Sequence, residues 1–160
     1  MAPVHFLIVD DEGGMRRALA RTIQGEYSDC TISEAGSAAE ALGMLDAHMF
    51  FDVIMSDNSM PGGLKGLEFL RQVAARFPRS VRILVTADRD SGQYAAAVFS
   101  GLLFAYLAKP WDPAELRAVI RNAVAKVLDP EGVQVDDDPD DDFDGAEPDP
   151  DDDSGEDGFC

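Results

Sequence analysis

The chain has 160 residues and is strongly acidic, because 31 Asp and Glu residues against 13 Lys and Arg residues give a formal net charge of −18. This length suits one domain of ordinary size with a short extension. A hydrophobic content of 46% is enough for a packed core and excludes a wholly disordered chain. The excess of acid argues against direct binding to a nucleic-acid backbone, which draws on clustered lysine and arginine.

The acidic residues gather at the C-terminal end. Residues 136–160 contain 14 acidic and no basic side chains, so the rest of the chain carries only 17 acidic residues against 13 basic ones. This segment consists largely of Asp, Pro and Gly, which cannot bury enough apolar surface to offset the entropy of ordering. We predict an acidic, disordered tail over residues 131–160. A run of like charges of this kind is commonly just solvated. The alternative is a flexible segment that binds a basic partner surface or mimics a nucleic acid, with Phe143 and Phe159 as its apolar anchors.

Nothing in the sequence indicates export or membrane insertion. Cys30 and Cys160 are too few for a disulfide framework. No stretch reaches 18 apolar residues, and the chain enters the apolar run at residues 5–9 without a basic region or a cleavage site. We expect a cytoplasmic protein.

Short apolar runs alternate with longer amphipathic segments five times along the chain. The runs cover residues 6–9, 30–35, 53–55, 81–85 and 102–107. The segments between them repeat apolar residues every three or four positions, which predicts helices. Ser37 with Glu40, and Asp112 with Glu115, form helix-start patterns, and Gly101 should end the fourth helix. Strands and helices that alternate in this way predict an α/β fold with a mainly parallel sheet and helices on both faces.

Polar side chains follow four of the five predicted strands. Asp10 and Asp11 follow the first run, Asp57 the third, Thr86 the fourth and Lys109 the fifth. In an open α/β sheet, ligands bind beyond the carboxyl ends of the strands. We therefore expect three carboxylates, a hydroxyl and an ammonium to meet at one edge of the sheet.

The expected cluster of carboxylates suggests its own chemistry. Two ionised carboxylates roughly 5 Å apart repel by about 3 kcal/mol at an effective dielectric constant near 20, so three require a cation or a retained proton. Mg²⁺, which prefers oxygen ligands, fits this need, with Asp10 and Asp11 as the natural pair of ligands. Asp57, alone at the end of the central strand, is then the best candidate to attack phosphorus and form an acyl phosphate. Lys109 and Thr86 would stabilise the transferring phosphoryl group.

These motifs carry a resemblance to a known family. They are Asp10-Asp11, Asp57 followed by Met60-Pro61-Gly62, Thr86-Ala87 and Lys109-Pro110. Together they resemble the receiver domain of bacterial two-component response regulators, including the chemotaxis receiver, over roughly residues 4–128. The resemblance implies a flavodoxin-like, doubly wound (βα)5 fold with the strand order 2-1-3-4-5. It places the receiver domain in residues 1–130.

The resemblance also implies a role for each site residue. Asp57 would accept a phosphoryl group from a histidine kinase or a histidine phosphotransfer protein. Asp11, Asp57 and the backbone carbonyl of Ser59 would ligate Mg²⁺, with Asp10 reaching it through water, and Lys109 would pair with the phosphoryl oxygens. Receivers catalyse their own phosphorylation and dephosphorylation, so the chain would not be a conventional enzyme.

The resemblance further implies a switch. Thr86 would move toward the phosphoryl group while Tyr106 rotates inward, which rearranges the face formed by the fourth helix, the fifth strand and the fifth helix, where partners of this family commonly bind. Tyr106 as a plain core aromatic is the alternative, and Trp111 is expected to plug a turn. Because nothing after Leu128 suggests an output domain, we expect a stand-alone regulator whose downstream protein target is unknown.

One departure from the family pattern and two other functions are open at this point. A glycine usually follows the phosphoacceptor by eight positions, whereas Gly66 follows Asp57 by nine, so the start of the third helix is uncertain. A pseudo-receiver that acts as a docking scaffold through its surface and acidic tail is the alternative function. A flavin or nucleotide enzyme ranks last, because no glycine-rich phosphate-binding pattern follows the first strand.

Overall fold

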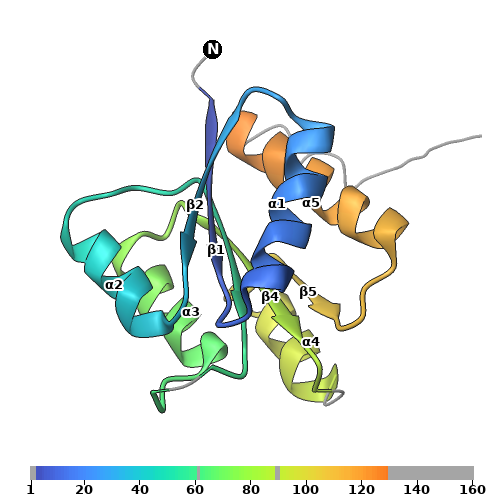
Figure 1. Cartoon of the computed structure of the whole chain (residues 1–160). Helices are drawn as coiled ribbons and strands as arrows, with labels where there is room; N and C mark the ends of the chain where they lie inside the picture. The colour runs from blue at the N-terminus through green and yellow to red at the C-terminus, as the bar shows by residue number, and fades with distance from the viewer. Residues whose placement is uncertain (1–2, 61, 89–90, 130–160) are drawn as a thin grey trace, which may run out of the picture. The chain divides into compact units, whose positions relative to one another are not determined.

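The computed structural model describes residues 3–60, 62–88 and 91–129, in which strands and helices alternate strictly (Figure 1). The elements are β1 (Val4–Val9), α1 (Gly13–Glu26), β2 (Cys30–Ala35), α2 (Ala38–Asp46), β3 (Val53–Asp57), α3 (Gly66–Arg76), β4 (Val81–Thr86), α4 (Ser91–Phe99), β5 (Ala105–Ala108) and α5 (Pro113–Leu128). The acidic tail predicted over residues 131–160, with Phe143 and Phe159, lies outside the described residues.

The five strands form one parallel sheet in the order β2-β1-β3-β4-β5, which confirms the predicted flavodoxin-like topology. β3 is buried along its whole length, as expected for a central strand between two layers of helices. β2 lies at an edge, and its alternating sequence fits that place. This strand order puts the carboxyl ends of β1 and β3 side by side, and the candidate site lies at those two ends.

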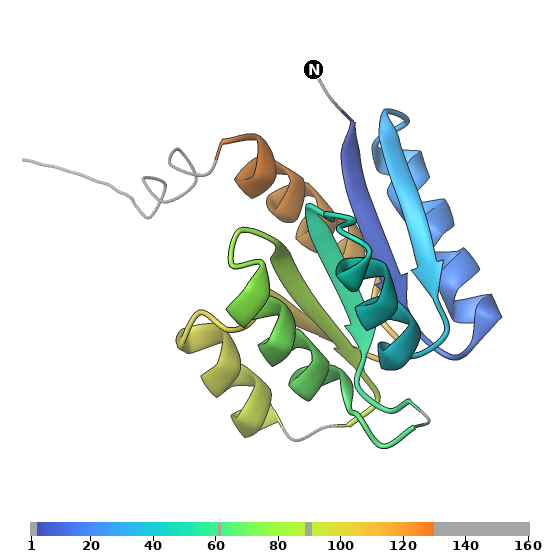
Figure 2. The same ribbon diagram turned by 90° about the vertical axis from the view of Figure 1, so that its left-hand side faces the viewer.

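Helices cover both faces of the sheet, with α1 and α5 on one face and α2, α3 and α4 on the other (Figures 1 and 2). Alternate residues of β1 enter the two cores: Phe6 and Ile8 join the core under α1 and α5, whereas Leu7 and Val9 join the opposite core. All four are fully buried. Each such side chain stabilises the fold by roughly 1.5–3 kcal/mol relative to exposure. The helices are therefore held to the sheet mainly by this apolar contact.

Both predicted helix-start patterns are present. The Ser37 hydroxyl accepts a hydrogen bond from the backbone N–H of Glu40 at 3.1 Å, and the Glu40 carboxylate accepts one from the N–H of Gly36 at 2.7 Å. Asp112 accepts from the N–H of Glu115 at 3.0 Å. These side chains satisfy backbone donors that lack a partner within the helix, which fixes where α2 and α5 begin.

The fifth strand begins later than the apolar run predicts. The run starts at Leu102, whereas β5 starts at Ala105. Gly101 adopts a positive φ of 89° just after α4, as predicted for a glycine that ends a helix. Arg82 then donates to the carbonyls of Gly101 at 3.2 Å and Leu102 at 2.7 Å, while Leu103 is buried in the core. The first residues of the run are therefore apolar because they close the core below a loop.

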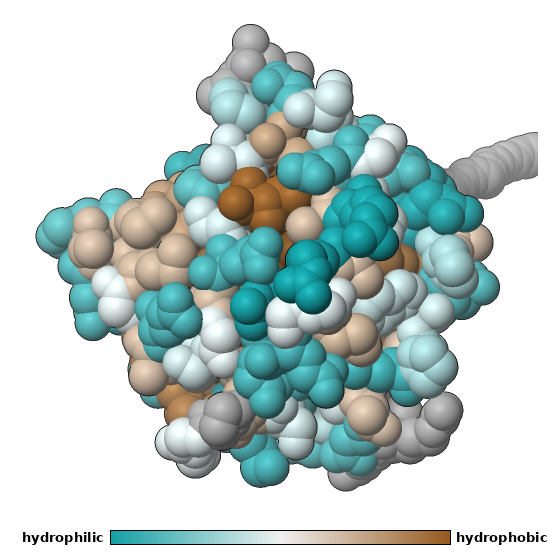
Figure 3. All heavy atoms as spheres, viewed as in Figure 1, coloured by the Kyte–Doolittle hydropathy of each residue, from teal (hydrophilic) through white to brown (hydrophobic). Residues whose placement is uncertain are grey.

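The outward side of α1 is hydrophilic, as the space-filling view shows (Figure 3). Its inward side buries Leu19 and Ile23 against the sheet. This division is typical of a helix that packs on a sheet and faces water on its other side. Among the described residues, no helix is both long and apolar enough to cross a membrane.

Candidate functional site

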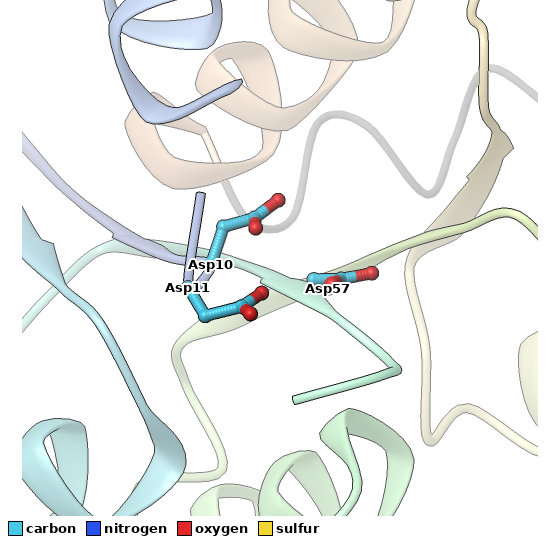
Figure 4. A group of neighbouring side chains, drawn as sticks. All are labelled: Asp10, Asp11 and Asp57. Atoms are coloured by element: carbon cyan, nitrogen blue, oxygen red, sulfur yellow. The ribbon is translucent and has the colours of Figure 1, made fainter. Parts of the chain in front are cut away.

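Three carboxylates meet where β1 and β3 end. Asp57 is the last residue of β3, and Asp10 and Asp11 follow β1 directly. One oxygen of each lies within 4.8 Å of the others (Figure 4). Asp10 and Asp57 are buried, with 1% and 6% of their surfaces exposed, whereas Asp11 is exposed. The cluster is thus buried at Asp10 and Asp57 and open to solvent at Asp11.

Lys109 brings the positive charge into the same cluster. It follows β5, and its backbone N–H donates to the carbonyl of Thr86 at 2.8 Å, which fixes the turn beside β4. Its Nζ lies 3.1 Å from Asp10 Oδ2 and 3.2 Å from Asp57 Oδ1. The side chain of Lys109 is 13% exposed, so both contacts are shielded from water. The predicted convergence of Lys109 with the aspartates is therefore present.

The negative charge of the three carboxylates exceeds the positive charge that Lys109 supplies. Burial raises the pKa of Asp57, and although Lys109 opposes this effect, the nearby charge of Asp10 adds to it, so the net direction is upward. Burial alone would lower the pKa of Lys109, but its hydrogen bonds and ion pairs with Asp10 and Asp57 outweigh burial and raise it. Lys109 is thus held as a cation, and one cation faces three carboxylates.

The donor set fits a magnesium ion. Mg²⁺ is a hard cation that binds carboxylate oxygens and keeps several waters, and three close carboxylates with one side open meet both requirements. Ser59 was predicted to add its backbone carbonyl. Ser59 is exposed next to the cluster, and its N–H hydrogen-bonds to the Asp57 carboxylate. The role of its carbonyl as a ligand stays a prediction.

The two predicted switch residues lie on β4 and β5, and β4 is the neighbour of the strand that ends at Asp57. Thr86 ends β4, is 2% exposed, and its hydroxyl accepts a hydrogen bond from the N–H of Asp88 at 3.0 Å. Tyr106, on β5, is half-buried, and its ring packs on that of Tyr94 with the centroids 5.7 Å apart. Trp111 is half-buried and packs against the core under α1 and α5; its role as a plug of the turn stays a prediction.

Sequence reasoning missed the residue that holds Asp10 in place. Arg16, on α1, donates to the Asp10 carbonyl at 2.5 Å and to the Glu34 carboxylate at 2.8 Å. A second hydrogen bond, from the N–H of Glu12, orients the Asp10 side chain at 2.9 Å. Glu34 is the next-to-last residue of β2 and pairs in register with Ile8 of β1. The expected strand order could have indicated this contact of Arg16 in advance, because that order places Glu34 beside the end of β1.

The extra loop residue before Gly66 leaves the start of α3 intact. α3 begins at Gly66, whose N–H donates to the carbonyl of Asn58 at 3.0 Å. The Asn58 side chain accepts from the N–H of Leu67 at 2.9 Å and so caps the helix in place of Lys65, which makes no such bond. Gly66 also lies against Asp57: a Cβ at this position would stand 2.1 Å from the Asp57 carbonyl oxygen. The glycine is thus required for a close approach of two backbones.

Comparison with known proteins agrees with this geometry. The chain is 38% identical over 118 residues to the hydrogenase transcriptional regulatory protein HoxA of Cupriavidus necator, covering 74% of this chain and 23% of that protein. It is 36% identical over 131 residues to the DNA-binding transcriptional regulator NtrC of Escherichia coli, covering 80% of this chain and 27% of that protein. The chain thus spans about a quarter of the length of these curated relatives.

A solved structure matches this chain over nearly its own whole length. The signal receiver domain of an HD domain-containing protein from Pseudomonas fluorescens has 28% sequence identity and a TM-score of 0.69, and the match covers 82% of this chain and 94% of that one. Residues 6–121 match the response regulator receiver domain family. On this match the chain belongs to the response regulator receiver domain family.

Proposed function

We propose that this chain works in a phosphorelay, in which Asp57 accepts a phosphoryl group from a histidine kinase or a histidine phosphotransfer protein. One observation carries the proposal: the buried Asp57 carboxylate lies within one cluster with Asp10 and Asp11 and 3.2 Å from Lys109. In a plain structural ion pair, a second and third carboxylate would only add repulsion. In a phosphoryl-transfer site they are the expected ligands of the metal.

The chemistry requires one bond to form and one to break. An oxygen of Asp57 attacks phosphorus, the bond between phosphorus and the donor nitrogen or oxygen breaks, and the leaving group keeps the bonding electrons. Lys109 carries three N–H donors, so it can contact a phosphoryl oxygen as charge leaves the Asp57 carboxylate. When bound, Mg²⁺ supplies charge neutralisation for the phosphoryl oxygens, held by Asp10, Asp11, Asp57 and, we propose, the carbonyl of Ser59.

The response to phosphorylation would pass through Thr86 and Tyr106. The Thr86 hydroxyl accepts a hydrogen bond from the N–H of Asp88, and a hydroxyl that accepts one bond can donate another, here to a phosphoryl oxygen. We propose that Thr86 moves toward the phosphoryl group while Tyr106 rotates inward, and that these two changes alter the face formed by α4, β5 and α5. That face carries Phe99, which is 95% exposed at the end of α4. A protein target that contacts this face would distinguish the two states, and its identity is open.

Two further parts of the proposal concern the chain as a whole. We propose residues 1–130 as the receiver domain and residues 131–160 as a separate acidic tail that phosphorylation does not require. We also propose that the chain acts through protein partners, in the cytoplasm and without direct contact to nucleic acid. HoxA and NtrC are named as transcriptional regulators, and the part of each that matches this chain is only about a quarter of its length.

The direct test is phosphorylation by a small donor. With Mg²⁺ and acetyl phosphate, the full chain should gain the mass of one phosphoryl group, and Asp57→Asn should abolish the gain because the attacking oxygen is lost. Asp46→Asn is the matched control, since Asp46 is exposed on α2 and pairs with Arg76 away from the cluster. Intact-mass spectrometry reads the result. No gain in the wild type, from acetyl phosphate or from a panel of kinases, would favour the docking scaffold instead.

Magnesium binding gives a separate prediction. Asp11→Asn should weaken Mg²⁺ binding by about tenfold or more, because it removes the one exposed carboxylate at the open side of the cluster. Isothermal titration calorimetry measures the affinity, again with Asp46→Asn as the control. Equal affinity in Asp11→Asn and the wild type would remove Asp11 from the proposed ligand set.

A further inference from the structure

Tyr94 is a buried tyrosine of α4 whose hydroxyl joins two loops. The residue is 1% exposed. Its hydroxyl accepts a hydrogen bond from the Asn58 side-chain amide at 3.2 Å and donates one to Asp88 Oδ2 at 2.9 Å. A hydroxyl buried among apolar groups needs such partners, because leaving it unsatisfied is costly. Here the partners come from two different loops at the carboxyl edge of the sheet.

One partner adjoins a proposed site residue in the chain, and the other is hydrogen-bonded to one. Asn58 follows Asp57 in the chain, and its N–H donates to the Val85 carbonyl of β4. Asp88 lies two residues after Thr86 and donates its N–H to the Thr86 hydroxyl at 3.0 Å. A continuous path of hydrogen bonds therefore runs from the segment after Asp57, through Tyr94, to Thr86. This path links the loop that follows Asp57 to the loop that follows Thr86, and it does not pass through the carboxylate cluster.

The ring of Tyr94 also contacts the proposed switch aromatic. It packs on Tyr106 with the centroids 5.7 Å apart and the planes tilted by 49°. Tyr94 thus stands between the hydrogen-bonded path and the side chain that would report the switch. Any shift of Thr86 toward Asp57 pulls on Asp88, and any shift of Tyr106 changes the packing of the Tyr94 ring.

We propose that Tyr94 is a positioning residue that stabilises the unphosphorylated conformation. This inference rests on the proposed function, because it concerns the same phosphoacceptor and switch. The hydrogen bonds from Asn58 and to Asp88 hold the two loops at their resting separation. When Thr86 moves to meet a phosphoryl group, the bond between Tyr94 and Asp88 lengthens or breaks. Interactions made only in the resting state oppose the change, so their removal shifts the population toward the phosphorylation-competent state.

The test compares Tyr94→Phe with the wild type and with Tyr27→Phe. Tyr94→Phe keeps the ring and removes the hydroxyl, and Tyr27→Phe removes a hydroxyl at the end of α1, on the opposite face of the sheet. With Mg²⁺ and acetyl phosphate, the phosphorylation rate of Tyr94→Phe should rise about tenfold, which corresponds to about 1.4 kcal/mol. Tyr27→Phe should react at the wild-type rate. Thermal unfolding of each variant reports stability separately.

A second variant shows whether the effect passes through Asp88. Asp88→Ala should also raise the rate, and the double variant with Tyr94→Phe should add little, because both changes remove the same tie. Amide hydrogen exchange should be faster in the first turn of α4 in Tyr94→Phe before any donor is added. A wild-type rate in Tyr94→Phe together with reduced stability would overturn the inference and leave Tyr94 a structural residue. If the wild type itself takes up no phosphoryl group, the proposed function fails first and this inference falls with it.

Discussion

Gly66→Ala should destabilise the fold by about 3 kcal/mol, because the new methyl group has no room. The added Cβ would lie 2.1 Å from the carbonyl oxygen of Asp57 and 2.9 Å from the Cα of Asn58, both of which are backbone atoms that cannot move aside alone. α3 would have to shift away from the end of β3. Urea unfolding followed by circular dichroism measures the change, and the phosphorylation rate should fall with it, since Asp57 is the residue displaced.

Gly43→Ala is the matched control for this substitution. Gly43 lies within α2, is exposed, and has nothing within 4 Å of the position of a Cβ. Alanine there should stabilise the protein by up to about 1 kcal/mol, because it favours the helix and restricts the unfolded chain. An unchanged urea midpoint in Gly66→Ala would mean that α3 does not approach Asp57 as closely as described.

Lys109→Met should have the second large effect, on both stability and chemistry. It leaves two buried carboxylates, Asp10 and Asp57, without their cation, and breaking a buried ion pair from one side commonly costs about 3 kcal/mol or more. Without Mg²⁺, the loss should appear fully in urea unfolding at neutral pH. Phosphorylation by acetyl phosphate should slow by about 100-fold or more, because a donor to the developing charge is removed. Lys126→Met, on α5, is the control and should leave both quantities near the wild-type values.

The same cluster gives the stability a defined pH dependence. The folded state raises the pKa of Asp57, so it binds this proton more readily than the unfolded chain does. The charged form of Asp57 therefore costs stability above its ordinary pKa, and this cost disappears as the pH falls below it. The raised pKa of Lys109 contributes stability at neutral pH that is lost only as the pH rises through its folded value. Lys109→Met without Mg²⁺ should thus regain stability on mild acidification more steeply than the wild type, and a flat profile would contradict this.

The sequence was sufficient to predict the location of the central site, for a simple physical reason. Parallel strands all end at one edge, so Asp10, Asp57 and Lys109 could be brought together from their places after apolar runs alone. The strand order itself came from the family resemblance, and the sheet confirms it. The roles of Ser59 and Tyr106 rested on that resemblance too, and they remain predictions.

Other features depended on contacts that no local pattern encodes. The bridge from Arg16 to Glu34 spans 18 residues, and the tie through Tyr94 joins residues 36 positions apart. Tyr94 in particular has the helical spacing of an ordinary core residue, so its hydroxyl network was invisible in the sequence. The start of β5 was misplaced for the related reason that Leu102 and Leu103 are as apolar as strand residues, although they belong to a loop.

The most direct measurement of the central claim is to locate the phosphoryl group itself. After reaction with acetyl phosphate and Mg²⁺, borohydride reduction converts an aspartyl phosphate to a stable residue that peptide mass spectrometry can place. We predict modification at Asp57 alone, and none when Mg²⁺ is chelated. Modification at Asp10, Asp11 or a histidine, or labelling of Asp57 that persists without the metal, would contradict the account.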